Sequence, residues 1–166
     1  MLLVQDQDTE LAADRHLQRV RRYLRFLGCP ASALDDVAQE TLVAGLGEWP
    51  TGDAPLPWLL ATARNQLRKL LRDQGRRREL ADVDRLDAMW QRHVPDAGDA
   101  RGEALRACLA ELPPRSRAVL QLRYGDGLDR AAIGARVGLG VEGVKSLLVR
   151  LREALARCIR RRCQDD

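Results

Sequence analysis

The chain has 166 residues and a formal net charge of +4, so it can form one ordinary domain or two very small ones. Aromatic residues make up 4% of the sequence, which argues against a protein that binds single-stranded nucleic acid on aromatic platforms. Because there is neither a long apolar run nor a signal peptide, the sequence predicts a cytoplasmic protein without membrane insertion.

The sequence offers little material for a catalytic or metal site. Its cysteines are Cys29, Cys108, Cys158 and Cys163. They lie too far apart for paired CxxC metal ligands, and we expect them to be reduced buried or incidental thiols. His16 and His93 are isolated from each other and from the cysteines. We therefore predict no metal, no cofactor, no catalytic residue and no enzymatic activity.

The first two predicted helices run from Leu11 to Gly28 and from Ser32 or Asp35 through the sequence DDVAQETLVAGL. In the second helix Asp36, Gln39 and Glu40 occur at i, i+3 and i+4, so they share one face. Such a face can dock against another protein's helix. General acid-base chemistry would need a histidine or metal partner, and the sequence supplies none nearby.

A third helix is predicted in PWLLATARNQLRKLLRDQ, which opens at Pro57. The apolar residues at helical spacing are Leu60, Ala63, Leu67 and Leu70. Arg64, Arg68 and Arg72 recur at i, i+4 and i+8 on another stripe. The helix is therefore expected to bury one side and to expose a basic one, and Trp58 at its start is interpreted as core packing.

The segment from Glu79 to Arg101 contains six acidic residues together with a proline and a glycine, and we interpret it as a linker. Beyond it the sequence predicts short helices at 102–112, 114–124 and 129–137, and a long helix from Val141 to about Arg162. The two halves share no repeat of fixed period.

The last two helices have the spacing of a helix-turn-helix unit. Gly138 marks the turn, and Gly134 permits a close helix crossing. The long helix has an apolar seam of Val144, Leu148, Leu151, Leu155 and Ile159. Away from the seam lie Glu142, Lys145, Ser146, Val149, Arg150 and Arg152. This mixed basic face suits the major groove of DNA, although a helical hairpin with a solvated charged side has the same pattern.

The segment from Glu111 to Leu155, which contains LPPRSRAVLQLRYGDGL and VKSLLVRLR, resembles region 4 of the extracytoplasmic-function (ECF) sigma factors. The resemblance continues upstream. DDVAQETLVAGL is similar to the region 2.2 pattern EDLVQETFLRAW of that family, and PWLLATARN is similar to its region 2.3 pattern AWLxxIARN. Together these motifs cover nearly all of residues 11 to 160.

The resemblance implies an all-α protein with two small helical domains, a region 2 helical bundle at 1–78 and a region 4 helix-turn-helix domain at 103–166, joined by a flexible linker at 79–102. It implies a sigma factor that binds core RNA polymerase through the beta-prime clamp helices and the beta flap, recognises promoter DNA and is held by an anti-sigma factor. The polymerase-binding residues implied are Asp36, Gln39, Glu40 and Thr41. Those implied at the -10 element are Arg64, Asn65, Arg68, Lys69 and Arg72. Those implied at the -35 element are Glu142, Gly143, Lys145, Ser146, Arg150 and Arg152.

Several residues depart from the family pattern. Gly143 and Leu147 replace the threonine and arginine that flank VKS, and Gly134 replaces an alanine at the helix crossing. We therefore expect a weak or unusual -35 preference. The alternative function is that of a degenerate sigma-like protein, which binds polymerase or an anti-sigma factor without reading a promoter.

Overall fold

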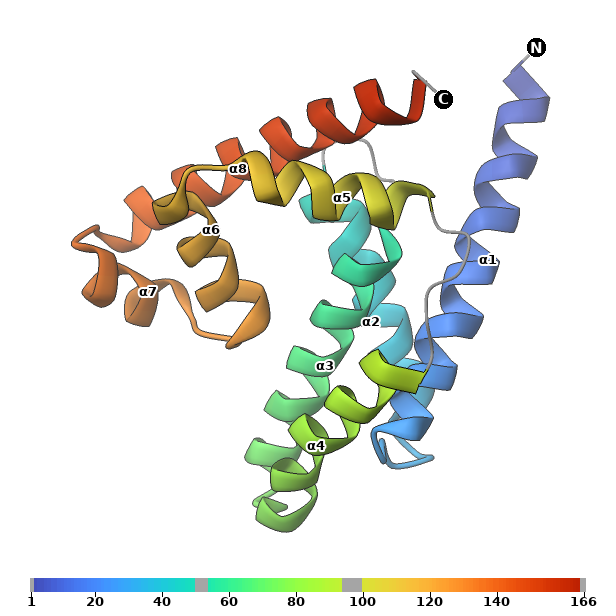
Figure 1. Cartoon of the computed structure of the whole chain (residues 1–166). Helices are drawn as coiled ribbons and strands as arrows, with labels where there is room; N and C mark the ends of the chain where they lie inside the picture. The colour runs from blue at the N-terminus through green and yellow to red at the C-terminus, as the bar shows by residue number, and fades with distance from the viewer. Residues whose placement is uncertain (1, 50–53, 94–99, 165–166) are drawn as a thin grey trace. The chain divides into compact units, whose positions relative to one another are not determined.

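The computed structural model describes residues 2–49, 54–93 and 100–164. Within those residues all regular secondary structure is helical, and there is no β-strand (Figure 1). The chain divides into two compact units, residues 1–44 with 62–95 and residues 45–61 with 96–166. The elements are α1 (Leu2–Phe26), α2 (Leu34–Glu48), α3 (Leu56–Asp73), α4 (Arg77–His93), α5 (Ala100–Glu111), α6 (Pro114–Leu120), the π-helical turn η1 (Gln121–Gly125), α7 (Arg130–Val137) and α8 (Val141–Gln164). The prediction of an all-α, two-domain protein is confirmed.

The first unit has its core between α1, α2, α3 and α4. Its buried residues include Val20, Tyr23 and Leu24 of α1, Val37 and Ala38 of α2, Ala63, Leu67 and Leu71 of α3, and Val83 and Trp90 of α4. α1 begins well before the predicted Leu11, and the chain leaves it through Gly28, whose φ of 83° suits glycine. Acidic residues occupy the first turn of α2, where the helix dipole favours them.

The prediction of a linker from Glu79 onward is wrong for residues 79–93, which form most of α4. Val83 is fully buried, and Trp90 packs its ring against Tyr23 and Phe26 of α1, with centroids 5.2 and 5.3 Å apart. Burial of these two α4 residues outweighs the segment's high charge and holds it as a helix on the first unit. Residues 94–99 of the predicted linker lie outside the described residues.

The second unit contains the helix-turn-helix. The predicted seam of α8 is buried throughout, from Val144 to Ile159. α7 starts at the N-cap Asp129, whose carboxylate accepts a hydrogen bond from the Ala132 amide, and it ends at Gly138 with φ of 74°. A Cβ at Gly134 would overlap the Leu139 carbonyl oxygen, so the close crossing expected there requires glycine.

Two further features of the second unit bear on the sequence predictions. Trp58 is buried and packs edge-on against Trp49, with ring centroids 4.9 Å apart, as the core-packing interpretation expected. The expectation of unpaired thiols is wrong for Cys108 and Cys158, which form a disulfide between α5 and α8. The two cysteines are 50 residues apart, so sequence spacing alone does not predict that they lie close together in the fold.

Candidate polymerase and nucleic-acid interfaces

The exposed face of α2 combines polar groups with an apolar centre. Asp36, Gln39 and Glu40 are all exposed, and Val43 beside them retains 67% of its accessible surface. Together with Ala44 and Gln66 they line one open depression. An exposed apolar residue with a rim of polar side chains is typical of a protein-docking surface. The structure thus brings these three predicted residues together on one accessible face.

Thr41, the fourth residue predicted to bind polymerase, is fully buried. Its hydroxyl lies 2.7 Å from the Val37 carbonyl oxygen and 2.8 Å from the side-chain amide of Gln66. Thr41 therefore ties α2 to α3 inside the unit. In this structure its side chain has no exposed surface for a partner, and it positions the neighbouring exposed residues.

The predicted basic stripe of α3 divides into two parts. Arg64 forms an ion pair with Asp87 of α4 at 2.8 Å, and the two side chains are only 15% and 13% exposed. Arg68 lies 3.6 Å from Asp84 of the same helix. By contrast Lys69 and Arg72 are exposed, and Asn65 is half-buried. Only the part of the stripe formed by Lys69 and Arg72 is therefore fully accessible to a nucleic acid.

Asp87 is the centre of a polar network that the sequence analysis missed. One carboxylate oxygen accepts a hydrogen bond from the Tyr23 hydroxyl at 2.6 Å, and the other accepts one from Arg64. Burial, followed by the hydrogen bond to Asp87, raises the pKa of Tyr23 far above its usual range, so the phenol stays protonated and keeps donating. The network joins α1, α3 and α4, and its acidic member lies in the segment interpreted as a linker.

The face of α8 that the sequence predicts to contact DNA is accessible where the helix begins. Glu142, Gly143, Lys145 and Ser146 are exposed, and so is Arg150 one turn farther on. Lys145 lies 3.9 Å from the Glu142 carboxylate, but both side chains are more than half exposed, so water screens this pair strongly.

Arg152 differs from the other predicted DNA contacts on α8. It is half-buried and donates a hydrogen bond to the Tyr124 hydroxyl at 3.1 Å. Upstream, Arg115 donates to the carbonyl oxygen of Val137, the last residue of α7, at 3.0 Å. Both arginines belong to the motif that resembles region 4. Arg115 links α6 to the end of α7 at the surface, and Arg152 links α8 to Tyr124 at a partly buried position.

The described residues give no sign of a metal centre or a membrane span. Nowhere in ranges 2–49, 54–93 and 100–164 do three His, Cys, Asp or Glu side chains gather as metal ligands would. Over the same part of the chain, no helix combines the length and apolar character needed to cross a bilayer.

Comparisons with known proteins identify both halves of the chain. The family model for Sigma-70 region 2 matches residues 12–77, and the model for Sigma-70, region 4 matches residues 102–155. The chain is also 33% identical over 148 residues to the ECF RNA polymerase sigma factor SigF of Caulobacter vibrioides (strain NA1000 / CB15N), an alignment that covers 86% of this chain and 80% of the relative.

These matches favour a promoter-directed sigma factor over a sigma-like protein that reads no promoter. They follow the order of the motifs along the sequence, with region 2 first and region 4 second. The chain belongs to the ECF sigma factors of the sigma-70 family, which bind core RNA polymerase and direct it to promoter DNA for transcription initiation.

Proposed function

We propose that this sigma factor divides its contacts among three exposed surfaces, one for polymerase and two for promoter DNA. The polymerase surface is the face of α2 formed by Asp36, Gln39, Glu40 and Val43. The observation that carries this proposal is that all four are exposed on one face, while Thr41 between them is buried. Such a surface suits a helical partner, and we assign it to the clamp helices of the beta-prime subunit.

For the -10 element we propose that Lys69 and Arg72 make the phosphate contacts, because their side chains are exposed on α3. Arg64 and Arg68 already have carboxylate partners on α4. Either of them could contact DNA only by exchanging Asp87 or Asp84 for a phosphate. Arg64 has the larger barrier, since its departure would leave a buried carboxylate without its positive partner.

For the -35 element we propose that Lys145 and Arg150 hold the DNA backbone and that Ser146 approaches the base edges. The front of α8 is the part of a helix-turn-helix that enters the major groove. Gly143 presents no side chain to the bases, so base discrimination there should be weak. Arg152, bonded to Tyr124, is better suited to holding the unit's shape.

The remaining assignments follow from family membership. We propose that residues 1–78 carry the polymerase and -10 functions, that residues 103–166 carry the -35 function and the contact with the beta flap, and that an anti-sigma factor holds the chain when it is inactive. Polymerase would supply all of the chemistry, so the chain itself would not be an enzyme. It would act in the cytoplasm, where polymerase and promoters are found.

Run-off transcription from genomic DNA tests the proposal directly. Purified core polymerase plus this chain should produce transcript starts that are absent with core alone and that share an upstream motif. The double variant Gln39→Ala with Glu40→Ala should remove those starts by weakening binding to core at least about tenfold. Asp73→Ala, at an exposed acidic residue of α3, is the matched control and should leave them. Binding to core without new starts would contradict promoter recognition, and unchanged starts in the double variant would contradict the α2 assignment.

A further inference from the structure

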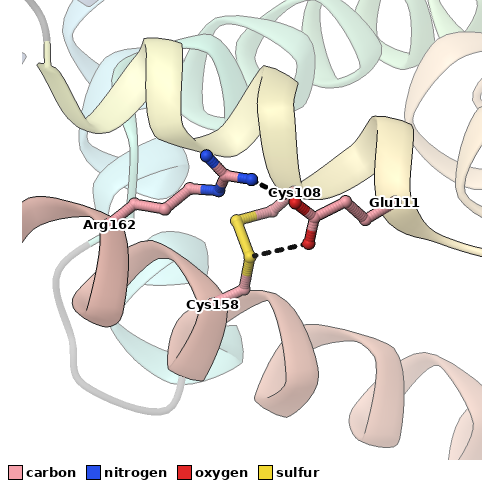
Figure 2. The surroundings of a disulfide bond; sticks show 4 residues. All are labelled: Cys108, Glu111, Cys158 and Arg162. Atoms are coloured by element: carbon pink, nitrogen blue, oxygen red, sulfur yellow. Dashed lines mark hydrogen bonds and ion pairs between the residues drawn. A yellow bond between two sulfur atoms is a disulfide. The ribbon is translucent and has the colours of Figure 1, made fainter.

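Two cysteines from distant parts of the chain meet in the second unit. Cys108 of α5 and Cys158 of α8 are joined by a disulfide, with Cα atoms 6.0 Å apart, inside the ordinary range for such bonds (Figure 2). The other two cysteines, Cys29 and Cys163, remain free. The fold thus brings one particular pair of thiols within bonding distance.

The two cysteines of the pair differ in how far they are exposed to solvent. Cys108 is 2% exposed in the core between α5 and α8, whereas Cys158 is half-buried. Figure 2 shows Glu111 and Arg162 beside the disulfide, with a dashed line from Glu111 to the Cys158 sulfur. A Glu111 carboxylate oxygen lies 3.9 Å from the Cys158 sulfur, and its other oxygen pairs with Arg162. A small reagent from solution would therefore reach Cys158 before Cys108.

Disulfides are rare in reducing compartments, and those that occur there are usually transient or redox-sensing. We propose that Cys108 and Cys158 form a reversible modification site, which is two thiols under reducing conditions and a disulfide after exposure to a two-electron oxidant such as hydrogen peroxide. The proposal is independent of which surfaces bind polymerase and DNA.

The oxidation can be written as two steps. The Cys158 sulfur attacks one peroxide oxygen, the O–O bond breaks, and Cys158 becomes a sulfenic acid while one water leaves. The Cys108 sulfur then attacks the Cys158 sulfur, the S–O bond breaks, and the second oxygen leaves as water with the remaining proton. In sum the two thiols lose two electrons and two protons, and one hydrogen peroxide becomes two waters. A dithiol reductant reverses the change by attacking the accessible Cys158 sulfur.

The position of the Cys108–Cys158 disulfide determines which properties of the second unit change on oxidation. α5 packs along α8, and the disulfide links two cysteines that are 50 residues apart in the sequence. The segment between them contains α6, α7 and the whole helix-turn-helix. A cross-link over so long a loop restricts the unfolded chain and so stabilises the folded unit. Cys158 lies 13 residues beyond Lys145 along α8, or about 20 Å. Oxidation should therefore strengthen the unit without altering the residues proposed to touch DNA.

The first test compares the full chain after treatment with hydrogen peroxide and after treatment with dithiothreitol. Peroxide should reduce the number of titratable thiols by two, and peptide mapping should find Cys108 linked to Cys158. The oxidised chain should unfold at a temperature higher by roughly 10 °C or more. Cys158→Ser and Cys108→Ser should each abolish the linked peptide and the shift, whereas Cys163→Ser should keep both.

Cys158→Ser is the more informative variant because its site is half-buried and should tolerate the change, even if Cys108→Ser in the core does not fold. Linked peptides that contain Cys29 or Cys163 in place of this pair would overturn the proposal. So would a midpoint of unfolding that is the same in peroxide and in dithiothreitol.

A second test asks where oxidation starts. Glu111→Gln would remove the negative charge that lies 3.9 Å from the Cys158 sulfur and pairs with Arg162. We expect this change to speed the loss of thiols by about two- to threefold, and added salt should reduce that difference. Glu103→Gln, at an exposed acid of the same helix, is the control and should change little. An unchanged rate in Glu111→Gln would overturn the assignment of Cys158 as the first sulfur to react.

Discussion

α3 and α8 both have basic stripes in the sequence, yet the structure gives the two stripes different roles. On α3, Arg64 and Arg68 are paired with acidic residues of α4, and Arg64 is mostly buried. On α8, Lys145 and Arg150 are exposed. Spacing along a helix identifies a basic face, but it does not reveal whether the protein's own carboxylates already occupy that face. Packing of α4 makes the first stripe partly structural, whereas Lys145 and Arg150 of the second stripe remain exposed.

The largest effect that would test this comparison is expected at Arg64. Arg64→Ala would leave the mostly buried Asp87 carboxylate without its positively charged partner, with hydrogen bonds from Tyr23 and Gln91 remaining, and the first unit should lose roughly 2–3 kcal/mol of stability. Chemical denaturation followed by circular dichroism measures this. Lys69→Ala, five residues farther along α3 and exposed, should cost less than about 0.5 kcal/mol. An equal loss of stability in the two variants would contradict the distinction between paired and exposed basic residues on α3.

The next effect concerns the helix crossing of the second unit. Alanine normally stabilises a helix relative to glycine by up to about 1 kcal/mol. Gly134→Ala should nevertheless lower stability by about 1–3 kcal/mol, because its Cβ would overlap the Leu139 carbonyl oxygen. Gly143→Ala is the matched control, since its Cβ would make only ordinary contacts, at 3.6 Å or more, with Leu139. Thermal unfolding of the two variants should shift in opposite directions, and a stabilised Gly134→Ala would contradict the crossing described.

Smaller effects are expected for the exposed basic residues of α8. Lys145→Ala and Arg150→Ala should each reduce the salt dependence of binding to a -35 duplex by about one unit of slope, and neither should change the midpoint of unfolding. Fluorescence anisotropy over a range of salt concentrations measures the slope. Arg152→Ala should behave in the opposite way, with a loss of stability and a nearly unchanged slope, because Arg152 is bonded to Tyr124.

The smallest expected effect is at Asp84. Its side chain is 64% exposed and lies 3.6 Å from Arg68, so the pair contributes only a few tenths of a kcal/mol to stability. Asp84→Asn should leave folding almost unchanged and strengthen binding to -10 DNA by about twofold, since Arg68 becomes available to phosphate. Asp82→Asn, which releases an arginine of α4 itself, is the control. An equal gain in both variants would indicate a general effect of charge.

The periodic spacing of apolar residues predicted most of the helices, because a helix and its buried face depend on residues only three or four positions apart. The seam from Val144 to Ile159 is buried as expected, and the turn lies at Gly138. The linker prediction does not include α4, because the acidic residues of this segment favour a solvated chain, although Val83, Leu86 and Trp90 have helical spacing. Asp87 with Arg64, and Cys108 with Cys158, meet only through tertiary packing, and the single sequence gives no signal for either contact.

The helical state of α4 also shortens the length of chain available between the parts that match Sigma-70 region 2 and region 4. Its 17 residues span about 25 Å as a helix, whereas the same residues fully extended would reach roughly 58 Å. While α4 stays packed on the first unit, little of its length can serve as a tether. We therefore expect that, while α4 stays folded, this sigma factor accepts a narrow range of spacer lengths between the -10 and -35 elements. Tolerance of longer spacers would then depend on the free energy needed to detach α4.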